Sequence, residues 1–97
     1  GACVSLAVFK HVVENQLPIN IVCALTLAEN SIDSKSYKPS DIIESYKGLT
    51  VEITNTDAEG RLCLADALTY VQKHYKPEYL IDLATLTGAV IVSLVIF

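Results

Sequence analysis

Two carboxylates and a guanidinium lie within five residues of one another in segment 55–62. If the backbone there is extended, side chains two apart project to the same side, so Asp57, Glu59 and Arg61 would face one another. Carboxylate oxygens are hard ligands for divalent cations, and two metal ions about 3.5–4 Å apart need a carboxylate that bridges them. Asp57 or Glu59 could supply that bridge. Gly60 would let the backbone approach a ligand closely, and Arg61 could present its planar donors to an anion.

The same segment also has a purely structural interpretation. Thr56 and Glu59 have the spacing of a capping box ahead of a helical apolar run, a pattern that commonly marks only the start of a helix. That cap does not require Asp57, Gly60 or Arg61, and glycine in a first helical turn is mildly destabilising. The residues therefore leave both a helix start and a metal or anion site open.

The flanking sequence predicts an α/β arrangement. Ala2–Glu14 repeats apolar residues every three or four positions, which predicts a helix with one wide buried face. Residues 19–28 are almost continuously apolar and rich in branched side chains, a pattern typical of a strand covered on both faces in a parallel sheet. Residues 79–84 predict a second such strand, and the polar residues 29–40 predict a loop.

Two further elements enclose the acidic segment. Alternating apolar and polar residues at 42–46 and 49–54 predict a half-exposed hairpin, and apolar residues at helical spacing predict a helix over 64–75. Periodicity does not distinguish helix from strand at residues 89–97. The order helix, strand, hairpin, helix, strand fits part of a mixed, largely parallel central sheet flanked by helices.

Composition and charge exclude several classes of partner. The 97 residues include 7 Lys and Arg against 11 Asp and Glu, a net charge of −4, and no basic run could neutralise a row of phosphates. Nucleic acid is therefore not an expected partner. The hydrophobic share is 52%, more than so short a chain can easily bury, which excludes disorder and suggests a missing partner surface.

Cysteine usage and the longest apolar stretch bear on location. The three cysteines are odd in number and lack C-x-x-C spacing, so we expect reduced core thiols in an intracellular protein; they are Cys3, Cys23 and Cys63. The longest uncharged stretch, residues 83–97, has 15 residues, fewer than the roughly 20 that a membrane-spanning helix needs. Because the chain opens at Gly1 directly into a helical pattern, we expect it to be a piece of something longer.

The acidic segment resembles a known signature. The eight residues Asn-Thr-Asp-Ala-Glu-Gly-Arg-Leu at 55–62 match in full the signature of the leucyl aminopeptidase family, the cytosolic two-metal aminopeptidases. Blocks similar to that family also occur in family order over nearly the whole chain. They are Ala-Glu-Asn at 28–30, Tyr-Lys-Pro at 37–39 with Asp41, Leu-Ala-Asp-Ala-Leu at 64–68 and Ala-Thr-Leu-Thr-Gly-Ala at 84–89. The chain departs from the family at Ser40 and Val95, where the family usually has glycine.

The resemblance implies that residues 1–97 are a central fragment of a metallo-aminopeptidase catalytic domain. By similarity, Asp57 and Glu59 are metal ligands, with Glu59 bridging two Zn²⁺ or Mn²⁺ ions, and Arg61 is the catalytic arginine that holds a bicarbonate. The residues similar to those that line the substrate pocket are Thr85, Leu86, Thr87 and Gly88. The full enzyme would be a cytoplasmic homo-hexamer that releases N-terminal amino acids, leucine by preference, from peptides with a free N-terminus.

The same resemblance implies that the set of ligands is incomplete. The family takes a lysine and two aspartates as further ligands, and another lysine for catalysis, from blocks that would lie before Gly1. Two carboxylates cannot fill two coordination shells, so this chain alone is expected to bind metal weakly and to hydrolyse nothing. The alternative is a non-catalytic remnant whose apolar surface serves only assembly with a full-length subunit.

Four other titratable side chains carry plainer interpretations. His11 and His74 have no second histidine or carboxylate at ligand spacing, so a solvated or helix-end role is expected for both. Asp66 either caps a neighbouring backbone or supports the signature segment, and the sequence leaves both open. Asp82, inside an expected buried strand, is interpreted as a paired structural carboxylate.

Overall fold

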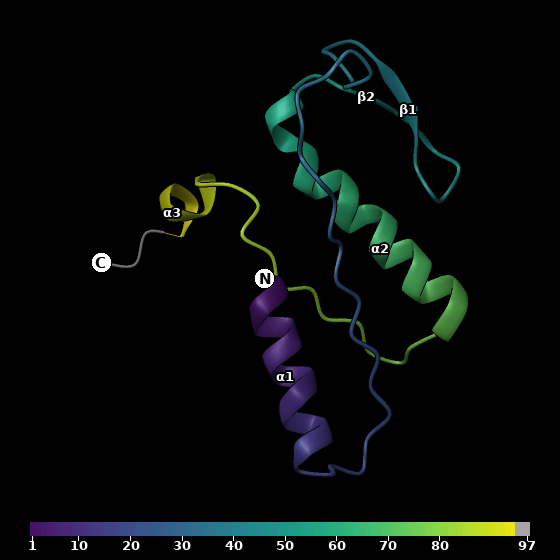
Figure 1. Cartoon of the computed structure of the whole chain (residues 1–97), viewed down its shortest axis with the longest axis vertical. Helices are drawn as coiled ribbons and strands as arrows, with labels where there is room; N and C mark the ends of the chain where they lie inside the picture. The colour runs from purple at the N-terminus through teal and green to yellow at the C-terminus, as the bar shows by residue number, and fades with distance from the viewer. Residues whose placement is uncertain (95–97) are drawn as a thin grey trace.

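A computed structural model describes residues 1–94 as helices and one small hairpin joined by long irregular segments (Figure 1). In chain order the elements are α1 (Ala2–Glu14), β1 (Ile42–Glu44), β2 (Thr50–Glu52), the 3₁₀ helix η1 (Thr56–Ala58), α2 (Glu59–Tyr75) and α3 (Ala89–Ser93). The hairpin lies at the N-terminal end of α2, and the chain returns from the other end of α2 towards the N-terminus (Figure 1).

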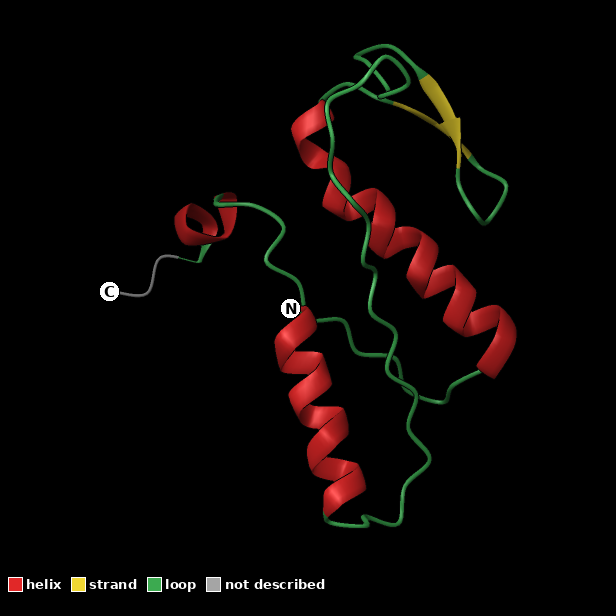
Figure 2. Ribbon diagram, in the orientation of Figure 1, coloured by secondary structure: helices red, strands yellow, loops and turns green. Residues whose placement is uncertain are grey.

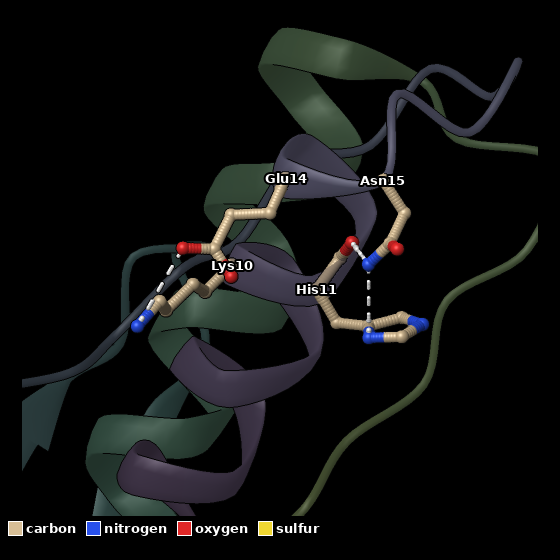
Figure 3. A network of polar contacts seen from close by, with 4 residues as sticks. All are labelled: Lys10, His11, Glu14 and Asn15. Carbon is tan, nitrogen blue, oxygen red and sulfur yellow. Dashed lines mark hydrogen bonds and ion pairs between the residues drawn. The ribbon is translucent and has the colours of Figure 1, made fainter.

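The first helix has the bounds that the apolar spacing predicts. It ends at Glu14, and the backbone N–H of Asn15 donates to the carbonyl oxygen of His11 at 3.1 Å. The Asn15 side-chain Nδ2 donates to the same carbonyl at 2.8 Å and lies 3.2 Å from His11 Nδ1 (Figure 3). His11 thus lies in the last turn, as its helix-end interpretation predicts. Lys10 and Glu14 add an exposed ion pair at 3.6 Å, of the kind that contributes about 0.3–0.5 kcal/mol (Figure 3).

The predicted hairpin is confirmed. Its strands pair antiparallel, with Ile43 opposite Val51, and Gly48 supplies the positive φ of 86° that the turn requires. The pairing extends one step beyond β2, because the Ile53 N–H donates to the Asp41 carbonyl at 2.8 Å and the Ile53 carbonyl accepts from Ser40 at 2.7 Å. Ile53 is only 3% exposed, so the base of the hairpin is the best-packed point in the described chain.

The second helix is longer than its apolar spacing predicts. It begins at Glu59, five residues before residue 64, and so includes the end of the acidic segment. It ends at Tyr75 because Lys76 adopts a left-handed conformation with φ 45° and Pro77 follows, which cannot continue a helix. Periodicity missed the first turn because that turn carries Gly60 and Arg61 and has no apolar stripe.

The two predicted parallel strands are wrong for this structure. Residues 19–28 and 79–84 are irregular, and the sheet in residues 1–94 is two-stranded and antiparallel (Figure 2). Within the described chain, no backbone–backbone hydrogen bond involves residues 20–30 or 77–87. Burial nevertheless alternates at 21–25, with every second side chain half-buried, as in a strand that lacks neighbours. A parallel strand needs at least one neighbouring strand to pair with, and the described residues offer none to these segments.

The apolar side chains are largely uncovered. The radius of gyration is 16.2 Å, whereas a compact domain of about 100 residues has about 13 Å. The accessible surface is 8433 Å², compared with about 5400 Å² for a compact chain of this mass. Val12 and Ile53 are the buried hydrophobic residues of the described chain, so the wide buried face predicted for α1 is not formed. The exposed apolar faces would need further protein surface to cover them.

The C-terminal segment is a short helix as far as the structure describes it. α3 covers Ala89–Ser93, which decides between helix and strand for that part of the segment. Val95, and the departure from the family noted there, lie outside the described residues. None of the helices described is both long enough and apolar enough to cross a membrane.

Candidate functional site

The acidic segment is a helix start and not an extended strand. Asn55 is extended, with φ −143°, and its Oδ1 accepts a hydrogen bond from the Asp57 N–H at 2.9 Å. Thr56–Ala58 then form the single turn of η1, and Glu59 is the first residue of α2 with φ −65°. The predicted capping box of Thr56 with Glu59 is therefore wrong, because Asn55 provides the cap and Ala58, which precedes α2, makes no side-chain cap.

This geometry corrects the argument that placed the trio on one face. Residues two apart in a helical backbone do not face each other, so backbone spacing does not turn Glu59 towards Asp57 or Arg61. Asp57 and Arg61 are exposed, and Glu59 is half-buried. The ion pair found in residues 1–94 joins Lys10 to Glu14, so neither carboxylate is paired with a cation in the described chain.

The two carboxylates border a wide open space that about half of the described residues also line. Asp57 and Glu59 both line an open space of about 2370 Å³ that Thr85 and Leu86 of the predicted pocket block also line. Small-molecule sites usually have about 300–1000 Å³, so this space has the size of a missing piece of protein rather than of a ligand pocket. Arg61, Thr87 and Gly88 are exposed and do not line it.

A direct contact joins the acidic segment to the pocket block. A Cβ built on Gly60 would lie 3.1 Å from Leu86 Cδ2, so the glycine lets the Leu86 side chain rest against the first turn of α2. The sequence predicted that Gly60 permits a close approach, and the approaching group within this chain is Leu86. Segments 26 residues apart in the sequence are thus brought together beside Glu59.

The donor set matches part of a metal site. Asp57 and Glu59 provide the hard oxygen atoms that divalent cations prefer. Among residues 1–94, however, no group of three or more His, Cys, Asp or Glu side chains has the arrangement of a metal site. The three cysteines are all free, and Cys3 is exposed, so it is not the core thiol that was expected.

The remaining carboxylates have different surroundings. Asp66 Oδ1 accepts a hydrogen bond from the Tyr46 N–H at 2.8 Å, as the backbone-capping alternative predicts. Asp82 is exposed in an irregular segment, so its interpretation as a buried paired carboxylate is wrong. The strand that would have buried Asp82 is not formed.

Sequence reasoning missed the surroundings of His74. The hydroxyl oxygen of Tyr46 lies 3.1 Å from His74 Nε2, and the rings of Tyr70 and His74 are 4.2 Å apart between centroids. Tyr70 and His74 are four residues apart on α2, so helical spacing could have indicated that pair. The contribution of Tyr46 from the hairpin turn had no sequence signal.

Comparison with known proteins bears directly on this segment. The family model described as the cytosol aminopeptidase family, catalytic domain, matches residues 1–95. The chain belongs to the cytosol aminopeptidase family. The resemblance carried by the signature at 55–62 is therefore confirmed.

Individual proteins of the family are also similar to this chain. A probable cytosol aminopeptidase of Blochmanniella floridana is 54% identical over 94 residues, which are 97% of this chain and 18% of that protein. Probable cytosol aminopeptidases of Cenarchaeum symbiosum (strain A) and Xanthomonas oryzae pv. oryzae (strain MAFF 311018) are 51% and 50% identical over 97% of this chain and 19% of theirs. The chain thus spans less than a fifth of the length of these relatives.

Proposed function

We propose that this chain carries part of the active site of a two-metal aminopeptidase. The observation that supports the proposal best is the unbroken octapeptide at 55–62 inside a family match over residues 1–95. The contact between Gly60 and Leu86 supports it further, because it brings one residue of the pocket block against the neighbour of Glu59. The reaction is removal of N-terminal amino acids, leucine by preference, from peptides with a free N-terminus.

Each proposed site residue has one role. Asp57 and Glu59 would hold two Zn²⁺ or Mn²⁺ ions, with Glu59 as the shared ligand, because their oxygens are hard donors beside the same open space. When bound, such a metal pair polarises the scissile carbonyl and supplies a hydroxide near neutral pH. Arg61, exposed and next to Gly60, would hold a bicarbonate through its planar donors.

The substrate would be held by the pocket block. Leu86 already lies against the first turn of α2, and the side chain of the N-terminal residue would lie against the rest of the block. The lining residues are Thr85, Leu86, Thr87 and Gly88. In a longer protein the chain would act in the cytoplasm, in keeping with the names that the relatives carry. The homo-hexamer is proposed from the resemblance to the family alone.

The isolated chain is proposed to be inactive. Two metal ions need more ligands than Asp57 and Glu59, and among residues 1–94 no third group joins them in a metal-site arrangement. A second candidate function is assembly alone, without catalysis. Large apolar side chains such as Leu27 and Ile81, which are 79% and 84% exposed, favour that candidate, because apolar patches of this kind usually meet another protein surface.

A chimera separates the two candidates. The matching segment of the Blochmanniella floridana relative would be replaced by this chain, which is 54% identical to it. If this chain carries a working half-site, the chimera should hydrolyse leucine p-nitroanilide with Mn²⁺ at a rate within about tenfold of the unaltered relative. The Glu59→Gln chimera should lose at least about a thousandfold, as expected when a residue essential to a catalytic unit is removed.

The unaltered relative is the control, and its own activity must be measured first. A chimera that assembles like the relative but hydrolyses nothing would support the assembly-only candidate. Full activity in the Glu59→Gln chimera would contradict the bridging role.

A further inference from the structure

The hairpin turn carries one side chain that runs along α2. Tyr46 follows β1 and precedes Gly48, and its N–H donates to Asp66 Oδ1 at 2.8 Å. Its hydroxyl oxygen lies 3.1 Å from His74 Nε2. Asp66 and His74 are eight residues apart, so Tyr46 spans about 12 Å of the helix at 1.5 Å per residue.

Two more residues of α2 hold the ring between those ends. The Tyr46 and Tyr70 rings are 5.8 Å apart at 47°, a tilted arrangement that aromatic pairs favour. Lys73 Nζ lies 4.7 Å from the centre of the Tyr46 ring, within the range of a cation–π contact. We call this set the Tyr46 clamp; it comprises Tyr46, Asp66, Tyr70, Lys73 and His74.

The clamp closes a loop that contains the acidic segment. Beyond the hairpin the chain passes through Ile53, which is bonded to Asp41, then through Asn55 and η1 into α2. The hairpin and α2 are therefore joined twice, covalently through residues 53–59 and non-covalently through Tyr46. If the clamp opens, the hairpin can change its angle to α2, and residues 53–59 must change conformation with it.

We propose that Tyr46 is a positioning residue for the Asp57 and Glu59 carboxylates. It fixes the angle between the hairpin and α2, and thereby the orientation of η1 and of the first turn of α2. This role deepens the proposed function and rests on it. Asp66 holds the backbone end of the clamp, and His74 meets the hydroxyl end.

The test uses four substitutions in this chain and in the chimera. Tyr46→Ala removes the ring contacts, Tyr46→Phe removes only the hydroxyl, and Asp66→Leu removes the acceptor, whereas Asp66→Asn keeps an acceptor oxygen and should rescue. Lys47→Ala is the matched control, because Lys47 is the exposed neighbour of Tyr46 in the same turn.

In this chain the readout is hydrogen–deuterium exchange, followed by mass spectrometry, of a peptide covering 53–62. Tyr46→Ala and Asp66→Leu should speed exchange there about tenfold, the effect of losing roughly one to two net contacts. Tyr46→Phe should give a smaller increase, and Asp66→Asn and Lys47→Ala should match the parent. An unchanged exchange rate at 53–62 in Tyr46→Ala would overturn the proposal, whether or not the hairpin itself exchanges faster. Exchange of this peptide in the parent chain at the rate of an unfolded peptide would also overturn it.

In the chimera the readout is the Mn²⁺ concentration for half-maximal activity, which a merely structural loss of folded enzyme would not move. Tyr46→Ala should raise it about tenfold, and Asp66→Asn should leave it unchanged. An unchanged value in Tyr46→Ala contradicts the positioning role. If instead every version of the chimera is inactive, the proposed function fails, and the exchange result still decides whether the clamp orders residues 53–62.

Discussion

Two parts of the chain differ in whether their backbone finds a partner. One is the hairpin with α2, residues 40–75, and the other comprises the two irregular apolar segments, residues 20–30 and 77–87. In the first region each element finds its partner nearby, through the β1–β2 ladder, the Ile53 bonds to Asp41 and Ser40, and the contact of Tyr46 with α2. The irregular segments have the more apolar sequences and yet no backbone partner in the described chain. Hydrophobicity alone therefore does not make a strand.

The difference follows from how each kind of structure is stabilised. An antiparallel hairpin needs only a turn and a few residues on either side, which this chain supplies around Gly48. A parallel strand needs neighbours that come from distant parts of a sequence and cover on both faces. The region that bears Asp57 and Glu59 is thus locally determined, whereas the region that bears Thr85 and Leu86 depends on contacts beyond its own segment.

Removing the buried side chain at the base of the hairpin should have the largest effect on this comparison. Ile53→Ala should lower the free energy of opening the hairpin by about 3 kcal/mol, because Ile53 is 3% exposed and truncation leaves a cavity. Hydrogen exchange of residues 41–54 measures it. Ile42→Ala, at a 72% exposed position of β1, is the matched control and should change little. Equal effects at both positions would mean that the hairpin has no packed base.

Enlarging Gly60 should disturb the contact between the two regions. Gly60→Val should destabilise the chimera by about 1–3 kcal/mol, because the added Cβ would lie 3.1 Å from Leu86 Cδ2. Adding Leu86→Ala should recover part of this loss, giving a coupling of about 1 kcal/mol in a double-mutant cycle measured by urea unfolding. Strict additivity of the two substitutions would show that Gly60 and Leu86 do not touch.

Relieving backbone strain at the hairpin base should stabilise the hairpin and so increase the difference between the two regions. Ser40 has φ 75°, a left-handed conformation that glycine adopts without cost. Ser40→Gly should stabilise the hairpin by about 0.5–1 kcal/mol, seen as slower exchange of the Ile53 amide. Faster exchange in this variant would contradict the assigned strain.

The smallest effect is expected in the irregular segments. Ile81 is 84% exposed, so Ile81→Ser should change the stability of this chain by less than about 0.5 kcal/mol. In the chimera the same change should cost about 2 kcal/mol or more, because the remainder of the protein would cover the segment. A negligible cost in both settings would mean that residues 77–87 stay uncovered in the longer protein too.

Sequence alone was sufficient where the pattern and its partner lie close together. It gave the bounds of α1, the hairpin around Gly48 and the family through residues 55–62. It failed for residues 19–28 and 79–84, where apolar runs were interpreted as strands although their partners are not in the described chain.

For the candidate site, the roles that the signature implies for Asp57 and Glu59 stay predictions. The expectations of an extended backbone and of a Thr56 cap were wrong. Asn55 could cap Asp57 only because the 3₁₀ turn intervenes before α2, a detail that apolar spacing does not encode. The role of Tyr46 depends on a contact across 20 residues, which no local pattern contains.

The account rests on Asp57 and Glu59 as metal ligands, and a calorimetric titration with Mn²⁺ tests this most directly. The chimera should bind two ions per subunit, the Glu59→Gln chimera at most one tightly, and this chain alone should bind weakly. Two tight ions in the Glu59→Gln chimera would contradict the assignment of the bridging carboxylate, and two tight ions in this chain alone would contradict the incomplete ligand set.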